Sequence, residues 1–211
     1  MMTNKARDAW QKLYSRHGMQ YGGTGDLSLL STVLAPGMIA MDAGCGDGKT
    51  TEALSRMCEV VGCDFSKEAL VSLRVQRDVD RIVNLVECEL GNLPFGSEKF
   101  DAVSCVHSLS HMRETERRAA APGISRVLKP RGHLFVEVFG VKDIRFGEGR
   151  EVEPASFLRG NGIMTHYFRE GEIATLFHGL ETVSEARYSR RVTYGTVAGR
   201  REIIQTLLRK P

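Results

Sequence analysis

The sequence has no long uninterrupted run of apolar residues. None of its runs approaches the roughly 18 residues that a membrane-spanning helix needs. The amino-terminal stretch MMTNKARDAWQK also lacks the apolar segment of a signal peptide. These two absences favour a cytoplasmic protein with no membrane partner.

Clustered metal ligands are missing as well. The chain has five cysteines and no pair of them with the CxxC spacing of zinc sites. We therefore expect no metal site, and reduced, buried thiols near strand ends.

Charge of one sign is not in large excess. The chain carries 29 basic and 26 acidic side chains, for a formal net charge of +3, which is too mild to predict nucleic-acid binding. The distribution is uneven, because residues 187–210 hold seven basic side chains and one acidic one.

Short apolar runs alternate with amphipathic stretches along the chain, which is typical of βαβ units and a parallel sheet. No internal repeat or low-complexity linker interrupts them, and 211 residues suit one α/β domain. Two long β-type runs, joined by the turn GTVAG, predict a carboxy-terminal hairpin. The expected strands are 38–42, 59–64, 82–89, 100–109, 132–140, 180–194 and 200–210, and the expected helices include 49–57, 66–77 and 169–179.

The first expected strand ends in a glycine-rich turn, AGCGDGKT at residues 43–50. A phosphate-binding P-loop needs glycine at its first position, where this chain has Ala43, and Asp42 would repel phosphates there. A dinucleotide fingerprint needs a third glycine where this chain has Lys49, although Asp64 suits a ribose. An adenosyl cofactor without phosphates fits better than ATP or NAD.

Acidic residues at three consecutive strand ends support such a cationic, phosphate-free ligand. Asp64 can accept both ribose hydroxyls, and Glu89 can accept from the adenine amine. Asp42 can either organise the turn or attract an ammonium group. In open α/β sheets, ligands bind at this carboxyl edge of the strands.

Four motifs in order resemble those of class I S-adenosylmethionine-dependent methyltransferases: MDAGCGDGKTTEAL, VGCDFSKEAL, LGNLPFGSEKFDAVSC and ISRVLKPRGHLFVEV. The resemblance covers about residues 38–140. It implies S-adenosyl-L-methionine as the cofactor and a doubly wound, mostly parallel seven-stranded α/β sheet with helices on both faces and the last strand antiparallel. It also implies cofactor contacts by Asp42, Gly44, Cys45, Gly46, Asp64, Phe65, Ser66, Glu89, Leu90, Cys105 and Val106.

The resemblance further implies one domain over residues 1–211. Lid helices are expected in 1–36, the cofactor-binding core in 38–140, a substrate loop in 140–168 and the hairpin in 180–210. In the lid, Tyr14 and Tyr21 would reach the cofactor, and Trp10 lies four residues before Tyr14 on the same expected helix. The glycines at 22, 23 and 25 would let the lid hinge.

Two departures from the family pattern concern local structure. Pro122-Gly123 predicts a broken or late helix where a continuous one is usual. Arg131 stands where a glycine is common in the turn before the fifth strand.

Candidate catalytic residues are few, because a sulfonium methyl needs mainly alignment. His111 follows the fourth strand and is the preferred base or orienting group, ahead of His107 and His166. A general base there would make the rate rise with pH through about 6.5. The acceptor pocket is expected between the amino-terminal helix, the end of the fourth strand and the loop from Gly140 to Tyr167.

The acceptor itself is not specified by any motif. No NPPY tetrapeptide occurs, which disfavours methylation of the amino groups of adenine or glutamine. No Pro-Cys pair occurs either, which disfavours methylation of cytosine at C5. A small molecule is expected first because no nucleic-acid module is appended, with a tRNA-modifying enzyme as the alternative and a non-catalytic cofactor-binding domain as the second. The basic hairpin is interpreted as a charged sheet edge, with RNA contact as the rival interpretation. A monomer or homodimer is expected.

Overall fold

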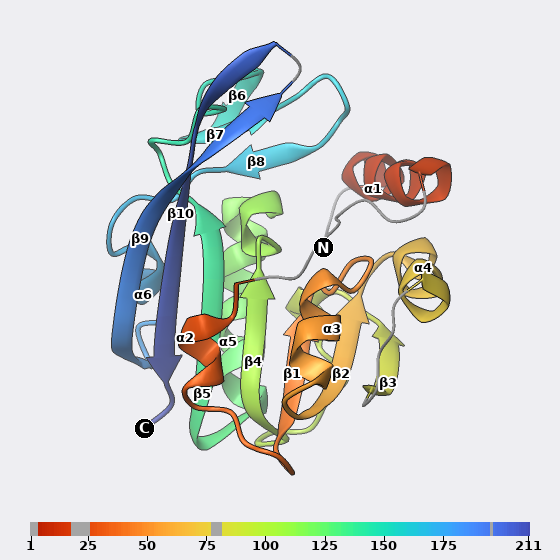
Figure 1. Ribbon diagram of the computed structural model, residues 1–211, viewed down its shortest axis with the longest axis vertical. Coiled ribbons are helices and arrows are strands. Elements are labelled where there is room, and N and C mark those ends of the chain that lie inside the picture. The colour runs from red at the N-terminus through yellow and green to blue at the C-terminus, as the bar shows by residue number, and fades with distance from the viewer. Residues whose placement is uncertain (1–3, 18–25, 77–81, 195) are drawn as a thin grey trace.

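A computed structural model describes residues 4–17, 26–76, 82–194 and 196–211. Its main sheet has seven strands in the described chain, in the order β3-β2-β1-β4-β5-β10-β9 (Figure 1). The strands are β1 (Ile39–Ala43), β2 (Glu59–Asp64), β3 (Ile82–Glu87), β4 (Phe100–Val106), β5 (Leu128–Phe139), β9 (Glu181–Tyr194) and β10 (Val197–Arg209).

The order of the strands reverses between β1 and β4. β1 pairs in parallel with β2 on one side and with β4 on the other, so the chain leaves both strands at the same edge. β10 is antiparallel to β5 and to β9. The predicted mostly parallel, seven-stranded sheet with an antiparallel last strand is confirmed. Such a reversal leaves a crevice at the carboxyl ends of the strands, where ligands bind.

Helices cover both faces of the sheet because the strands are apolar on both sides. They are α1 (Asn4–His17), α2 (Ser28–Ser31), α3 (Lys49–Ser55), α4 (Lys67–Gln76), α5 (Glu114–Val127) and α6 (Glu172–Leu176), with the short 3-10 turns η1 (Leu90–Asn92) and η2 (Leu109–His111). Leu30 of α2 and Leu54 of α3 pack with Ala40 on one face. Ile124 of α5 and Phe177, which follows α6, pack with Met41 on the other. Among the described residues, none of the helices is long and apolar enough to span a lipid bilayer.

The segment expected to be an aperiodic loop contains a small antiparallel sheet instead. It consists of β6 (Arg150–Glu153), β7 (Ser156–Leu158) and β8 (Met164–His166). Strands of three or four residues are too short to show an alternating pattern in the sequence, which is why this prediction was wrong. The small sheet lies beside the tip of the β9–β10 hairpin, on the side of the main sheet where the parallel strands end (Figure 1).

The expected break at Pro122-Gly123 is also wrong, because α5 runs through it without interruption. A proline inside a helix removes the hydrogen bond to the carbonyl four residues earlier. That carbonyl belongs to Arg118, which is exposed and can bond to water. Ala120, Ala121 and Ile124 are buried against the core, and this packing offsets the lost bond.

Arg131 does adopt a conformation that glycine favours, with φ of 65°. Its backbone N–H donates to the carbonyl of Lys210, 3.1 Å away. The cost of a left-handed residue, about 1–2 kcal/mol, is therefore accepted inside β5, where Lys210, the residue after β10, holds the backbone of Arg131.

Candidate active site

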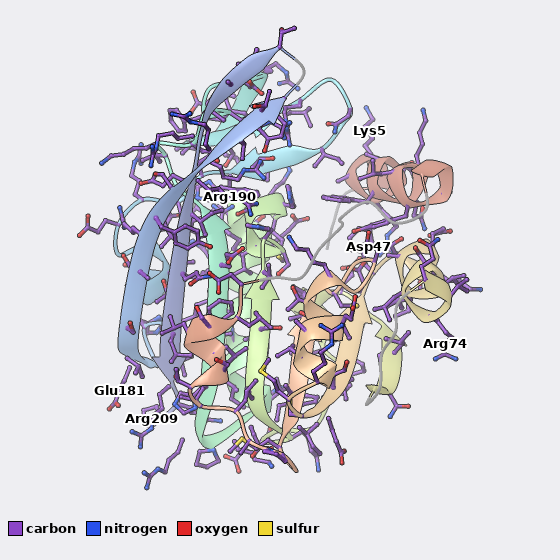
Figure 2. All side chains as sticks on the ribbon, in the orientation of Figure 1. Lys5, Asp47, Arg74, Glu181, Arg190 and Arg209 are labelled. Carbon is purple, nitrogen blue, oxygen red and sulfur yellow. The ribbon has the colours of Figure 1, made fainter. Side chains whose placement is uncertain are left out.

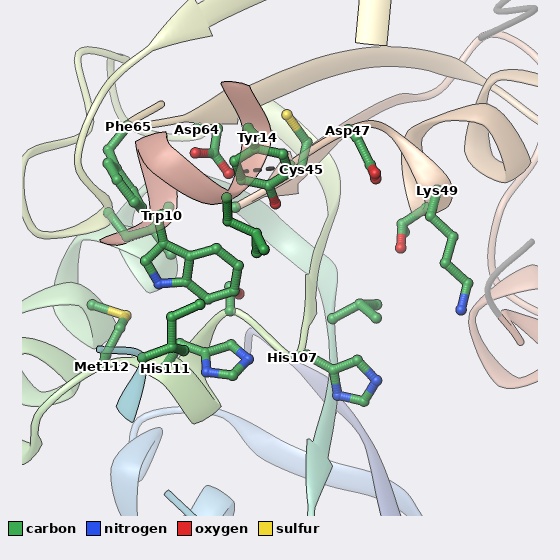
Figure 3. Close-up of a pocket in the computed structure, with 18 of the residues that line it drawn as sticks. Trp10, Tyr14, Cys45, Asp47, Lys49, Asp64, Phe65, His107, His111 and Met112 are labelled. Carbon is green, nitrogen blue, oxygen red and sulfur yellow. Dashed lines mark hydrogen bonds between the residues drawn. The ribbon is translucent and has the colours of Figure 1, made fainter. Parts of the chain in front are cut away.

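A cavity of about 590 Å³ lies at the carboxyl ends of the parallel strands. Its walls come from α1, from the ends of β1, β2 and β4, from the 140–167 segment and from the β9–β10 hairpin. Figure 3 shows the carboxylates of Asp64 and Asp47 on one side of this cavity and the rings of His107 and His111 on the other. Three of these walls are the ones that the sequence predicted around the acceptor.

The glycine turn after β1 needs glycine at two positions for reasons of space. Gly44 has φ of 77°, and a Cβ placed on it would lie 2.5 Å from the Cβ of Ser108. Gly46 has φ of 54°, and a Cβ there would lie 2.6 Å from the hydroxyl of Tyr14. The turn is thus in close contact both with the residue after β4 and with α1.

Asp64, at the end of β2, is held by the same turn. Its two carboxylate oxygens accept from the backbone N–H groups of Gly46 and Ser66, each at 2.9 Å. Burial raises the pKa of Asp64 to about 6, although these hydrogen bonds oppose the shift. Each carboxylate oxygen can accept a second hydrogen bond, so Asp64 can still bind two hydroxyl groups of a ligand in the cavity.

Asp42 lies beneath the turn and is not among the residues that line the cavity. Its oxygens accept from the hydroxyls of Thr51 at 2.7 Å and Ser104 at 2.8 Å. Burial raises the pKa of Asp42 to about 6. This carboxylate therefore joins β1 to α3 and β4, which favours the organising role over direct attraction of an ammonium group.

The far end of the acidic side is closed by α1. Arg7 donates to Glu89 at 2.5 Å, and its guanidinium lies 5.4 Å from the centre of the Phe65 ring. Glu89, Phe65 and Leu90 all line the cavity. The helix therefore contacts the side chains that the family pattern assigns to the adenosine.

Four aromatic rings line the opposite end. Trp10 meets His111 edge-on with centroids 4.9 Å apart, and His107 stacks on Phe139 at 4.1 Å with an interplanar angle of 13°. His111 also lies 6.3 Å from Phe139. These rings give the cavity flat apolar surfaces on which a planar ligand can stack.

His111 is neutral in this environment. Burial lowers its pKa to about 4, and the hydrogen bond from Nδ1 to the Met164 carbonyl, 2.8 Å long, only partly opposes this. Because a carbonyl can only accept, Nδ1 carries the proton and Nε2 is left as an acceptor. The expected inflection near pH 6.5 would therefore move to lower pH if His111 were the base.

His107 belongs to a buried polar network. Its Nε2 lies 3.1 Å from Oε1 of Glu137, and Gln205 of β10 donates to the other oxygen at 2.7 Å. Burial lowers the pKa of His107, so we assign it as a neutral ring that donates to an ionised Glu137. His107 has φ of 59°, an uncommon conformation for a residue other than glycine.

Basic side chains gather at the same end as the aromatic rings. The arginine cluster, defined here as Arg145, Arg159, Arg190 and Arg201, lines the cavity together with Lys49. Its members come from the 140–167 segment and from both strands of the hairpin. One cavity therefore has an acidic end at Asp47, Asp64 and Glu89 and a basic end beyond the aromatic rings.

Comparison with known proteins shows which family the sequence resembles. The model of the family described as "Methyltransferase domain" matches residues 41–136. The chain is 30% identical over 199 residues to tRNA N(3)-methylcytidine methyltransferase Mettl2 of Drosophila melanogaster, covering 86% of this chain and 61% of that protein. Residues 41–136 thus form a methyltransferase domain, and the chain has the fold of solved S-adenosylmethionine-dependent methyltransferases.

Two further similarities place this methyltransferase. It is 34% identical over 108 residues, 51% of its chain, to the human protein named "Probable tRNA methyltransferase 9B", of which it covers 22%. A SAM-dependent methyltransferase from Methanosarcina mazei superposes with a TM-score of 0.73 at 21% identity, over 86% of this chain and 96% of that one, which shows the shared fold. The chain thus spans at most 61% of the length of these two curated relatives.

These relatives bear on the acceptor of the methyltransferase. Both curated proteins are named for tRNA, whereas the sequence placed a small-molecule acceptor first and tRNA as the alternative. The predicted cofactor, S-adenosyl-L-methionine, is confirmed by the family match together with the fold shared with S-adenosylmethionine-dependent methyltransferases.

Most of the residues that the sequence assigned to the cofactor line the cavity of the methyltransferase. Asp42, Ser66 and Cys105 do not: Ser66 caps α4 by accepting from the Ala69 N–H at 3.2 Å, and Cys105 is fully buried. Tyr21 and the glycines at 22, 23 and 25 fall outside the described residues. The residues in the lining are Tyr14, Gly44, Cys45, Gly46, Asp64, Phe65, Glu89, Leu90 and Val106.

His166 is a buried structural residue rather than a site residue. Its two ring nitrogens bond to Ser156 at 2.8 Å and to Glu172 at 2.6 Å. Sequence reasoning missed the Glu137–His107 pair and the cavity-facing arginines. The basic bias of residues 187–210 was the available signal for Arg190 and Arg201, but it does not say which of the hairpin arginines face inward.

Proposed function

We propose that the methyltransferase acts on a base of tRNA, with cytidine as the first candidate. The proposal is carried by the four aromatic rings of Trp10, His107, His111 and Phe139 at one end of the cavity. Enzymes that modify a base take it out of its stack and hold it between aromatic and apolar side chains. The name of the Drosophila relative, a tRNA N(3)-methylcytidine methyltransferase, supports the same acceptor.

Two ring nitrogens in this end suit the exocyclic amine of such a base. With Nδ1 of His111 donating to Met164, Nε2 is an acceptor. With Nε2 of His107 donating to Glu137, Nδ1 is an acceptor, and it has no hydrogen-bond partner within the described chain. The exocyclic amine of cytosine is a hydrogen-bond donor that two such nitrogens can bind.

The chemistry that these residues must supply is mainly alignment. S-adenosyl-L-methionine, when bound, brings an already activated methyl group. Asp64 and Glu89 suit its ribose and adenine, and the aromatic rings would hold the acceptor in the plane required for attack. A ring nitrogen that attacks with its own lone pair needs no general base, which agrees with the lowered pKa of His111.

The test supplies methyl-labelled S-adenosylmethionine with bulk tRNA in one reaction and a small-molecule cell extract in another. Asp64→Asn serves as the cofactor-binding control. We expect label in a methylated cytidine after the tRNA is digested to nucleosides and analysed by mass spectrometry. Label found only in the small-molecule extract would contradict the proposal and restore the small-molecule acceptor. Intact S-adenosylhomocysteine binding with no transfer in either reaction would favour the non-catalytic alternative.

A further inference from the structure

The arginine cluster concentrates positive charge at the basic end of the cavity. Arg190 on β9 stands directly opposite Arg201 on β10 in the hairpin register. Like charges at directly opposed positions destabilise a sheet. Figure 2 shows Arg190 at nearly the same height as Asp47, whereas Arg209 lies near the bottom of the view, at the base of the hairpin. Of the two opposed arginine pairs in the hairpin, this one lines the cavity.

Few carboxylates balance this charge. Among the described residues, Asp143 lies 3.3 Å from Nε of Arg201, and Glu148 lies 4.0 Å from Arg145 at an exposed position. Four guanidinium groups therefore face two carboxylates, one of which is weakly placed. Inside a cavity, an excess of positive charge attracts anions more strongly than it does on an open surface.

Aromatic rings hold two members of the cluster in position. The guanidinium carbon of Arg145 lies 3.4 Å from the centre of the Tyr194 ring, and that of Arg201 lies 4.4 Å from Phe139 and 5.4 Å from Tyr194. Stacking fixes the plane of a guanidinium and leaves its edge free to donate. A pre-oriented pair of this kind suits a phosphate, which accepts two parallel hydrogen bonds.

One donor of the cluster also lacks an acceptor within the part of the chain that the structure describes. Nε of Arg159 is buried and has no hydrogen-bond partner there, whereas Nε of Arg201 faces the Asp143 carboxylate at 3.3 Å. A buried donor without a partner is costly, so a ligand oxygen at this place would stabilise the arrangement.

We propose that the arginine cluster is a phosphate subsite, which binds a backbone phosphate next to the base that the aromatic rings hold. This deepens the proposed function and rests on it for the source of the phosphate. The phosphate group itself is common to RNA and to free nucleotides. Phosphate contacts fix the register of a nucleic acid without reading its sequence, so the subsite would position the base rather than select it.

The hairpin offers a matched control. Arg191 and Arg200 form the neighbouring cross-strand pair, and alternation along a strand turns their side chains to the opposite face. The inward double variant, Arg190→Met/Arg201→Met, and the outward double variant, Arg191→Met/Arg200→Met, therefore remove the same charge from the same hairpin. Arg190→Met alone provides a milder inward variant, because Arg201 also contacts Phe139 and Asp143.

Each protein, saturated with S-adenosylhomocysteine, is titrated calorimetrically with cytidine, with cytidine monophosphates and with inorganic phosphate. We expect wild type and the outward variant to bind a monophosphate about tenfold or more tightly than cytidine. The inward double variant should bind both alike, and Arg190→Met should lie between. Equal affinity of wild type for nucleoside and nucleotide would overturn the subsite, as would identical behaviour of the two double variants.

Methylation of tRNA separates the subsite from the proposed function. If the inward double variant raises the KM for tRNA more than the outward double variant does, and both keep their affinity for S-adenosylhomocysteine, the subsite is used by RNA. Tight binding of free monophosphates through Arg190 and Arg201, with no tRNA methylated, would assign the phosphate to a small nucleotide and contradict the RNA source. If neither double variant alters the methylation of tRNA, the phosphate subsite is overturned and the proposed function still stands.

Discussion

The acidic and basic ends of the cavity are built in different ways. The acidic end uses Asp64, Glu89 and the Gly44–Gly46 turn, which follow successive parallel strands and lie within one stretch of the chain. The basic end combines α1, the residues after β4, the 140–167 segment and the hairpin. The residues at the ends of the parallel strands supply the negative charges, whereas the 140–167 segment and the antiparallel strands β9 and β10 supply the positive ones. The two ends of one cavity would thus suit a cationic cofactor and the anionic acceptor that we propose.

The acidic end is tested most directly by Asp64→Asn. The loss of two charge-assisted hydrogen bonds, about 1.5–3 kcal/mol each, should weaken S-adenosylhomocysteine binding by roughly 10²–10⁴-fold in calorimetry. Asp101→Asn is the control, because Asp101 pairs with Lys129 at the start of β4 and should leave this affinity unchanged. Near-normal binding of S-adenosylhomocysteine by Asp64→Asn would contradict the assignment of the acidic end as the cofactor site.

The two ends should respond differently to His111→Gln. His111 lines the basic, aromatic end and is already neutral, with a pKa of about 4. We expect about a tenfold loss of turnover on tRNA, the size of one neutral hydrogen bond, with S-adenosylhomocysteine affinity unchanged.

The pH profile of turnover distinguishes orientation from base catalysis by His111. Orientation predicts no inflection near pH 6.5 in wild type. A wild-type inflection there that disappears in His111→Gln, together with a loss of 10²–10⁴-fold, would instead identify His111 as the general base.

The pH dependence of cofactor affinity tests the electrostatics of the acidic end. Asp64 has a pKa raised to about 6 by burial, and hydroxyl donors favour its ionised form. Affinity should therefore be full above pH 6 and fall as the pH drops through it, by about tenfold between pH 7 and pH 5. Calorimetry at several pH values should show this slope in wild type and not in Asp64→Asn. A similar slope in both proteins would point to a group other than Asp64.

The smallest effect is expected for Arg7→Met, which removes the ion pair between α1 and Glu89. Both side chains are partly exposed, at 31% and 23%. Such a pair contributes about 0.2–1 kcal/mol, so thermal unfolding and S-adenosylhomocysteine affinity should change little. Glu89→Gln should weaken the affinity more, because it also removes the acceptor assigned to adenine. Equal effects of the two variants would mean that the pair, and not the adenine contact, is what matters.

The sequence by itself determined the parallel core and the acidic end. The glycine turn, Asp64 and Glu89 could be found because each follows a strand whose apolar run is visible, and parallel strands deliver their carboxyl ends to one edge. The hairpin was visible for the same reason, since its two strands are long and are joined by the turn GTVAG.

Only the tertiary structure decided what lies opposite that edge. In the structure, Asp42 accepts hydrogen bonds from Thr51 and Ser104 and does not line the cavity. Helix α5 continues through Pro122, and residues 150–166 form a small sheet. The tertiary structure also brought Arg145, Arg159, Arg190 and Arg201 to one cavity with Trp10 and His107. Contacts between segments so far apart in the chain depend on the register of β10 on β5 and on which face of each strand is buried, and no local pattern of residues encodes either.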